Sequence, residues 1–181
     1  MQEANGHDRD TIQKHWVLLL WGTASCSLSF FLASFQVHEK SILLVLAPCA
    51  LLLGQDEAFV EWFSILCTWS LWPLLQVDRL QVPYVCTLII FISLRWLQNS
   101  NQEKIQKGSV FSGPFLAIPG LTYAGMIGLH LAELLVDLPA NLPDLFPVLW
   151  SLFGCAMFSF AWLLVCTKLT TVRKLDKVKA H

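Results

Sequence analysis

The sequence is poor in charge and lacks the usual signatures of a soluble enzyme. Only 14% of its 181 residues are charged, whereas 55% are hydrophobic and the mean hydropathy is +0.57. It contains no glycine-rich phosphate loop, and its six cysteines form no CxxC pair of the kind that binds zinc or undergoes redox exchange. This composition excludes an ordinary soluble domain and indicates an integral membrane protein.

Six runs are nearly free of charge, and most approach the roughly 20 residues that cross a hydrocarbon core. They cover residues 16–35, 41–53, 58–77, 80–94, 115–136 and 145–167. Because a chain in lipid must satisfy its own backbone hydrogen bonds, each run is predicted to be helical. The sequence therefore predicts an all-α, polytopic transmembrane bundle of about six spans. No basic region leads into a short apolar core at the start, so we expect the first run to be a retained span and not a cleaved signal peptide.

The basic residues predict the orientation of this bundle. If all six runs cross, the connecting segments alternate sides, and ten of the twelve Lys and Arg residues fall on one side. The other side receives only Lys40 and Arg79. Since basic residues accumulate on the cytosolic side, we expect the polar segment 1–15 and the basic tail 168–181 to be cytosolic and residues 36–40 to be lumenal. We also expect residues 1–15 to be mobile and the linker 95–114 to be a solvated loop.

The run 41–53 is the weak point of this topology. Its thirteen residues would give only about 20 Å of helix, with Pro48 in the middle, so a re-entrant segment is the alternative. That alternative would place nine basic residues outside and three inside. The charge distribution therefore favours a short span.

Polar and small residues inside the runs have structural and functional interpretations. The small residues of 22–29 predict a closely packed neighbouring helix. Glu61 is interpreted first as an interfacial carboxylate that reaches water and second as the lining of a polar cavity. His130 and Glu133 share a helical face, and we favour a hydrogen-bonded pair inside the bundle over a metal site. The six cysteines all lie in apolar runs, so we expect them to be small core residues without disulfides.

The most specific pattern is FQVHEKSILL at residues 35–44, where Gln36, His38, Glu39 and Lys40 separate two apolar runs. We interpret it as a tight hairpin tip at the membrane surface. On physical grounds alone, a hydrated turn between two helices is favoured over a binding site.

This pattern, together with CTWSLWPLLQVDRLQVP and the later NLPDLFPVL, resembles the dolichyl-phosphate-glucose α-1,3-glucosyltransferases of N-glycan precursor assembly. The resemblance covers about residues 31–167 and is to the C-terminal part of these GT-C type enzymes. It is closer to the enzyme that adds the first glucose to Man9GlcNAc2-diphosphodolichol than to its sister enzyme.

The resemblance implies a glucosyltransferase of the endoplasmic reticulum membrane that uses dolichyl-phosphate glucose and a lipid-linked oligosaccharide, without metal, cofactor or nucleic acid. His38 and Lys40 would bind the donor phosphate and stabilise it as it leaves, and Glu39 would orient one of them. Lys177 and Lys179 resemble the cytosolic dilysine signal that retrieves residents of this compartment. The basic tail that holds them should lie against an anionic leaflet.

The chain also departs from the family. Members are two to three times longer, and their proposed catalytic Asp lies in a large lumenal loop near the N-terminus that has no counterpart here. We therefore assign no catalytic residue, and Asp78, Asp137 and Asp144 are not substitutes. We expect a fragment or truncated form; the alternative is a small accessory membrane protein that keeps only the donor-binding half. A transporter or channel is disfavoured, because there is no internal repeat and little charge at mid-span depth.

We predict that this chain, expressed alone in cells that lack the glucosyltransferase, does not restore glucosylation of the lipid-linked oligosaccharide. The physical reason is that inverting transfer needs a carboxylate general base, for which we assign no residue. Mass analysis of the oligosaccharide released from dolichol checks this, with the full-length enzyme as control. Full restoration would show that the family's first lumenal loop is dispensable.

Overall fold

The computed structural model describes residues 2–34, 39–100, 109–111, 115–136 and 144–179, and every regular element in these ranges is helical. The α-helices are α1 (Gln2–Ala33), α2 (Ile42–Ala50), α3 (Glu57–Ser70), α4 (Trp72–Val77), α5 (Gln81–Ser100), α6 (Ile118–Leu135) and α7 (Leu145–Lys179). Two 3-10 turns, η1 (Glu39–Ser41) and η2 (Leu51–Gly54), flank α2. The predicted all-α bundle is confirmed.

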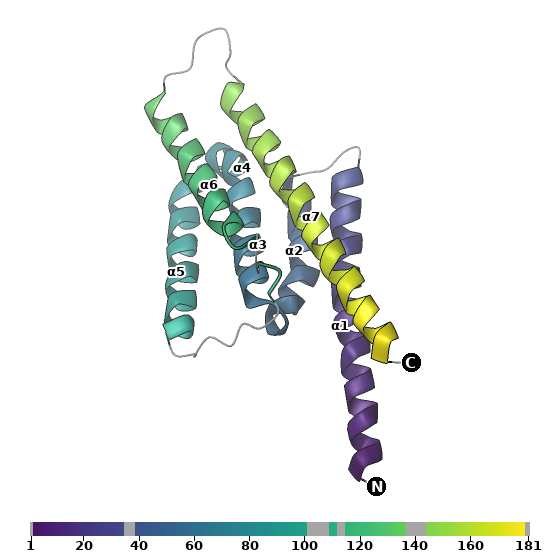
Figure 1. The fold of residues 1–181 in the computed structure, drawn as a ribbon. Coiled ribbons are helices and arrows are strands. Elements are labelled where there is room, and N and C mark those ends of the chain that lie inside the picture. The colour runs from purple at the N-terminus through teal and green to yellow at the C-terminus, as the bar shows by residue number, and fades with distance from the viewer. Residues whose placement is uncertain (1, 35–38, 101–108, 112–114, 137–143, 180–181) are drawn as a thin grey trace.

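The helices alternate in direction along the bundle. Figure 1 shows α1, α3 and α6 running toward one end, while α2, α5 and α7 return toward the other. We call the end at which α1 stops and α2 begins the tip end, and the end at which α7 stops the tail end. The start of α1 also lies toward the tail end (Figure 1). This alternation is the up-and-down order that six passes require.

Four helices of the described residues are long and apolar enough to cross a membrane, and they lie in α1, α5, α6 and α7. The other two predicted spans are shorter. The segment Ile42–Gly54 is a short apolar helix that tightens into η2. The predicted span 58–77 is divided into α3 and α4 at Leu71, because Pro73 has no N–H to donate and its ring crowds the preceding turn.

Helix α1 begins earlier than the sequence indicated. We expected a mobile segment over residues 1–15, but the helix runs without interruption from Gln2. Extending an existing helix adds one hydrogen bond for each residue fixed and avoids the cost of a new nucleus. The polar residues before Trp16 therefore continue the apolar helix that follows them.

Helices α1 and α7 form the closest pair in the bundle, as the small residues of 22–29 predicted. Ala24 and Leu28 are fully buried. Trp162 Nε1 donates to Ser29 Oγ at 2.7 Å, and Ser25 Oγ lies 3.3 Å from Cys166 Sγ. Because small residues let the two backbones approach, these polar side chains bond directly across the interface.

An aromatic core fills the space between α1, α3 and α7. Phe59, Trp62 and Phe63 of α3 are almost completely buried, as is Trp21 of α1. The ring centroids of Phe59 and Phe63 lie 5.7 Å apart in a stacked pair, and Trp21 lies 5.7 Å from Phe59. These large, specific contacts hold α3 against the α1–α7 pair.

Buried Asp56 ties the start of α3 to a distant segment. One carboxylate oxygen accepts from Phe59 N at 3.1 Å, which caps α3, and from Ser109 Oγ at 2.9 Å. The other accepts from Val110 N at 2.6 Å. Residues 109–111 are therefore not part of a solvated loop as we expected, since Val110 and Phe111 are buried. Hydrogen bonds from several N–H and O–H donors to the buried Asp56 carboxylate hold residues 109–111 against the start of α3. The composition of the linker could not indicate this contact.

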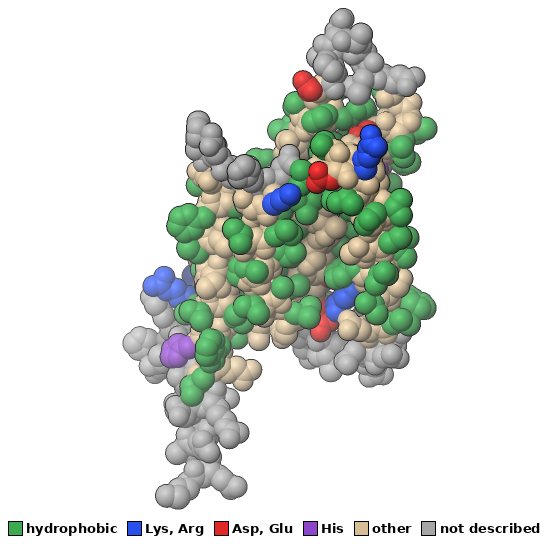
Figure 2. Space-filling model, turned by 180° about the vertical axis from the view of Figure 1, so that it is seen from behind, with side chains coloured by type: hydrophobic (Ala, Val, Ile, Leu, Met, Phe, Trp, Pro, Cys, Tyr) green, Lys and Arg blue, Asp and Glu red, His purple; other side chains and the backbone are tan. Residues whose placement is uncertain are grey.

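The surface of the bundle is mostly apolar. Figure 2 shows acidic and basic side chains at two levels, with an apolar band between them. Cys49 and Cys67 are core residues as predicted, but Cys26, Cys86 and Cys155 are exposed on this surface. The expectation that all six cysteines belong to the core was wrong, because a residue of an apolar span can equally face lipid.

We predict that Asp56→Ala lowers the free energy of unfolding by about 2 to 4 kcal/mol, because it removes a helix cap and leaves the buried Val110 N–H without a partner. Thermal unfolding of the detergent-solubilised protein checks this. Glu57→Ala is the control: its exposed carboxylate forms only a surface ion pair with Arg95, worth about 0 to 1 kcal/mol. Equal losses in the two variants would contradict the role of Asp56.

Candidate functional site

The structure describes part of the predicted hairpin tip. Lys40 lies in η1 with an exposed side chain. Glu39 begins η1, but its side chain lies outside the described residues, as does the whole of His38. The side chain of Lys40 is therefore exposed at the tip end, and the donor-binding role of all three residues stays a prediction.

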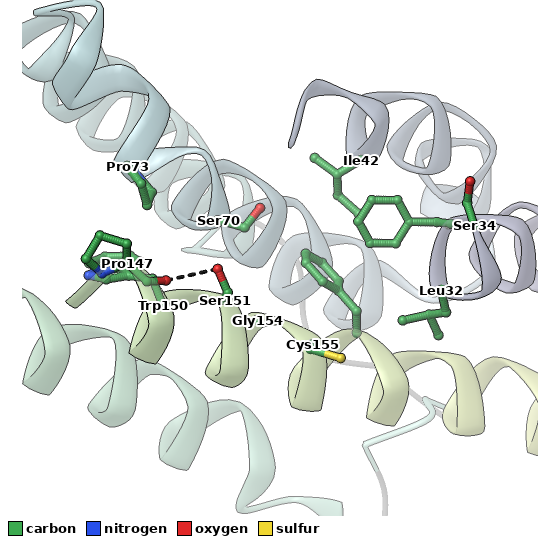
Figure 3. Close-up of a pocket in the computed structure, with 12 residues that line it drawn as sticks. Leu32, Ser34, Ile42, Ser70, Pro73, Pro147, Trp150, Ser151, Gly154 and Cys155 are labelled. Atoms are coloured by element: carbon green, nitrogen blue, oxygen red, sulfur yellow. Dashed lines mark hydrogen bonds between the residues drawn. The ribbon is translucent and has the colours of Figure 1, made fainter. Parts of the chain in front are cut away.

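A hollow of about 320 Å³, which we call the first hollow, lies between the tip end of α1 and helix α7. Figure 3 shows its wall side chains, which also come from α2, α3 and α4. The lining residues are Phe31, Leu32, Ser34, Ile42, Ser70, Pro73, Pro147, Trp150, Ser151, Gly154, Cys155 and Phe158. Most of these are apolar, so the hollow offers an apolar slot at the same end of the bundle as Lys40.

A second hollow of about 340 Å³ lies between α1 and α2. It shares Phe31 and Ser34 with the first and is also lined by Ser41, the residue that follows Lys40. The hydroxyls of Ser34 and Ser41 make no hydrogen bond to any described residue. Two hydroxyls without a hydrogen bond therefore line apolar space at the tip end, and Lys40 directly precedes one of them in the chain.

The other hydroxyls of the first hollow are already bonded to backbone. Ser70 Oγ donates to Cys67 O at 2.8 Å, and Ser151 Oγ donates to Pro147 O at 2.9 Å (Figure 3). Each can still accept a hydrogen bond but has no proton left to donate. Donors for an anion are therefore concentrated at Ser34, Lys40 and Ser41.

This arrangement suits binding better than catalysis. An anionic headgroup would receive hydrogen bonds at the tip, and an apolar chain attached to it would enter the hollows. Among the described residues that line either hollow, none carries a carboxylate. The described lining of the two hollows therefore supplies no carboxylate general base.

A larger cavity of about 970 Å³ lies elsewhere, among α3, α4, α5 and α6. We call it the α3–α6 cavity. His130 and Glu133 line it, but they are not the hydrogen-bonded pair that we favoured. Glu133 accepts instead from Trp72 Nε1 at 3.0 Å and from Gln76 Nε2 at 2.9 Å. Among the described residues, no three His, Cys, Asp or Glu side chains group as metal ligands.

Glu61 lines a cavity, as its second interpretation held, and its interfacial position stays a prediction. It lines the α3–α6 cavity, and its side chain is 37% exposed. Its carboxylate pairs with the Arg95 guanidinium at 3.4 Å, and Glu57 pairs with the same guanidinium at 3.3 Å. The sequence did not indicate these ion pairs, because Arg95 is distant from α3 in the sequence and lies toward the C-terminal end of α5.

Lys177 and Lys179 lie at the end of α7, which continues to Lys179. Their side chains lie outside the described residues, so the retrieval signal stays a prediction. The tail belongs to the same helix as the last span.

Sequence reasoning did not identify the wall that α7 contributes to the first hollow. Its members recur at Ser151, Gly154, Cys155 and Phe158, a spacing that places them on one helical face. The sequence pattern that could have indicated this wall is a row of small residues followed by an aromatic residue on one helical face. The same pattern is also typical of close helix packing, so it does not identify a hollow.

Comparison with known proteins gives a consistent match. The profile of the ALG6, ALG8 glycosyltransferase family matches residues 10–164. Dolichyl pyrophosphate Man9GlcNAc2 alpha-1,3-glucosyltransferase of Mus musculus is 38% identical over 154 residues, which cover 75% of this chain and 30% of the relative. The protein of that name from Saccharomyces cerevisiae is 32% identical over 179 residues, covering 83% of this chain and 32% of the relative. The chain thus spans about 30% of the length of the curated relatives it matches.

Proposed function

The chain belongs to the ALG6, ALG8 glycosyltransferase family, as its resemblance indicated, and we propose that it forms the donor-binding part of a dolichyl-phosphate-glucose dependent α-1,3-glucosyltransferase. In this role it helps to transfer glucose to the lipid-linked oligosaccharide Man9GlcNAc2-diphosphodolichol. The observation that carries the proposal is the exposed side chain of Lys40, which directly precedes Ser41 in the lining of the second of two apolar hollows at the tip end of the bundle.

The donor has two parts, and the tip end offers a suitable environment for each. Its phosphate is an anion, which Lys40 and the free hydroxyls of Ser34 and Ser41 can bind by hydrogen bonds. Its polyprenyl chain is apolar and would occupy the first or second hollow, between helices. His38 would supply a further donor, and Glu39 would orient His38 or Lys40.

The same contacts would act during the reaction. As the bond between glucose and phosphate breaks, negative charge grows on the dolichyl phosphate that leaves. Fixed donors at the phosphate stabilise this charge more than they stabilise the intact donor, which lowers the barrier. The mannose hydroxyl that attacks needs a general base, which the described lining residues do not include.

The proposed site requires a lumenal tip end in the endoplasmic reticulum membrane. The distribution of basic residues supports this orientation, because Lys168, Arg173 and Lys174 lie toward the tail end of α7 and would be cytosolic. Lys177 and Lys179 would then lie where a dilysine retrieval signal is read. We propose no nucleic-acid partner.

A second candidate is a non-catalytic membrane subunit that binds the donor without transferring glucose. The absence of a carboxylate among the described residues that line the two hollows favours it. The two candidates share the donor site and differ only in whether transfer follows binding.

We predict that Lys40→Ala and His38→Ala each weaken binding of dolichyl phosphate to this chain in nanodiscs by about tenfold or more, because each removes a charge-assisted donor. Lys40→Arg keeps the charge and should bind nearly as well as the unaltered chain. The same alanine substitutions in a full-length protein should raise the KM for dolichyl-phosphate glucose.

The control is Lys174→Ala, which removes an exposed cation from the tail end of α7. It should leave dolichyl phosphate binding unchanged. Unaltered binding in both tip variants, or an equal loss of binding in the Lys174 variant, would contradict the donor site. Residues 36–40 would then be interpreted as a hydrated turn.

A further inference from the structure

The α3–α6 cavity is separate from the tip and differs from it in charge. Its walls carry two carboxylates, Glu61 and Glu133, and no Lys or Arg is among its described lining residues. The tip end, in contrast, presents the Lys40 ammonium. A phosphate group suits the tip but would be repelled in the cavity, so the two sites favour different ligands.

The cavity runs along the bundle. Glu61 lies in the first turns of α3, toward the tail end, and Glu133 lies in the last turn of α6, at the tip end. Between them the walls are apolar, with Ile65 from α3, Leu88 and Ile92 from α5, and Met126 from α6. Along α6 alone, from Tyr123 to Glu133, the helical rise is about 15 Å, which accommodates an extended hydrocarbon chain.

Polar groups gather at the tip end of this cavity. Trp72 and Gln76 each donate one hydrogen bond to Glu133, so its carboxylate has two neutral partners there and lone pairs to spare. The Trp72 ring lies 5.1 Å from Tyr84 and 4.7 Å from His130 between centroids. Aromatic faces beside a carboxylate are the chemistry that binds a substituted ammonium.

The carboxylate at the other end of the cavity is already compensated. Glu61 pairs with Arg95, so it does not compete for a second cation. Glu133 has hydrogen bonds but no ion pair among the described residues. Glu133 is therefore the carboxylate of the cavity whose negative charge is not balanced by a described cation.

We propose that the α3–α6 cavity binds a lipid that has one long apolar chain and a protonated amine headgroup, the chemistry of a sphingoid base. The ammonium would bind Glu133 next to the Trp72 and Tyr84 rings, and the chain would extend along the apolar wall toward Glu61. A phospholipid with an amine headgroup fits less well, because its phosphate would lie close to the Glu133 carboxylate.

This proposal goes beyond the glucosyltransferase role and does not depend on it. An aromatic pair lies between the two sites, because Trp150 lines the first hollow and Trp69 lines the α3–α6 cavity, with stacked rings 4.0 Å apart. A brominated ligand in either site would lie near this pair, so binding in the cavity is measured with the tip site occupied by dolichyl phosphate.

The experiment compares three probes with the same chain and different heads. 12-Bromododecylamine, 12-bromododecanol and 12-bromododecyl phosphate are added to the chain in phosphatidylcholine nanodiscs that contain excess dolichyl phosphate to occupy the tip site, and bromine quenching of tryptophan fluorescence is recorded. The amine should reach half-maximal quenching at a concentration about tenfold or more below those of the other two. Equal quenching by all three probes, or no saturable quenching, overturns the proposal.

Two variants locate the site. Glu133→Gln keeps the shape of the side chain and should abolish the preference for the amine, whereas Leu88→Phe narrows the apolar part and should weaken binding of the amine. Glu57→Gln removes a carboxylate that does not line the cavity and should leave the preference unchanged. A preserved preference in the Glu133 variant overturns the proposal.

A lysophosphatidylethanolamine that displaces the bromoamine at equal or lower concentration also overturns it, since the site would then accept a phosphate. If the Glu133 variant unfolds at a lower temperature than the unaltered chain, its loss of binding is not used. The proposal is then tested by the preference of the unaltered chain for the amine probe over the alcohol and phosphate probes.

Discussion

The structure depends on one constraint: inside a hydrocarbon layer every backbone N–H and C=O must find its partner within the chain. The chain meets this with helices in every described element, and on the face shown in Figure 2 the acidic and basic side chains lie at two levels with an apolar band between them. Where a helix must break, as at Leu71, the break comes near the tip end, next to the exposed turn at Arg79, whose φ of 56° lies in the left-handed region. Function is consequently expected at the ends and in the few polar contacts between helices.

Three polar contacts between elements show where the few charged side chains of the bundle are placed. Asp56 joins the start of α3 to residues 109–111 at the tail end. Arg95 joins α5 to α3 through Glu57 and Glu61, and Glu133 joins α6 to α4. Each buried or half-buried carboxylate has donors from a different element, which offsets the cost of taking it out of water. At the tip end, Lys40 is exposed and free for a ligand, and Arg79 is a second exposed cation at this end.

Much of the fold was predictable because apolar runs and small residues act locally. The boundaries of α6 and the contact of α1 with α7 both follow from such patterns. The distant partners of Asp56 and Glu133 were not predictable, since they lie 53 or more residues away and no periodicity marks them. At the candidate site the sequence identified Lys40 and the family, but the hollows beside it are built by residues of α1 and α7 that meet only in the folded bundle.

The central claim is that the tip end, with Lys40, faces the compartment in which glucose is added to the lipid-linked oligosaccharide. Its most direct test is a glycosylation acceptor sequence inserted after Val37, with the same sequence inserted after Gln102 as control. The account predicts that the first insertion is glycosylated in endoplasmic reticulum membranes and that the second is not. Glycosylation of the second insertion alone would place the tip in the cytosol and contradict the donor site together with the topology.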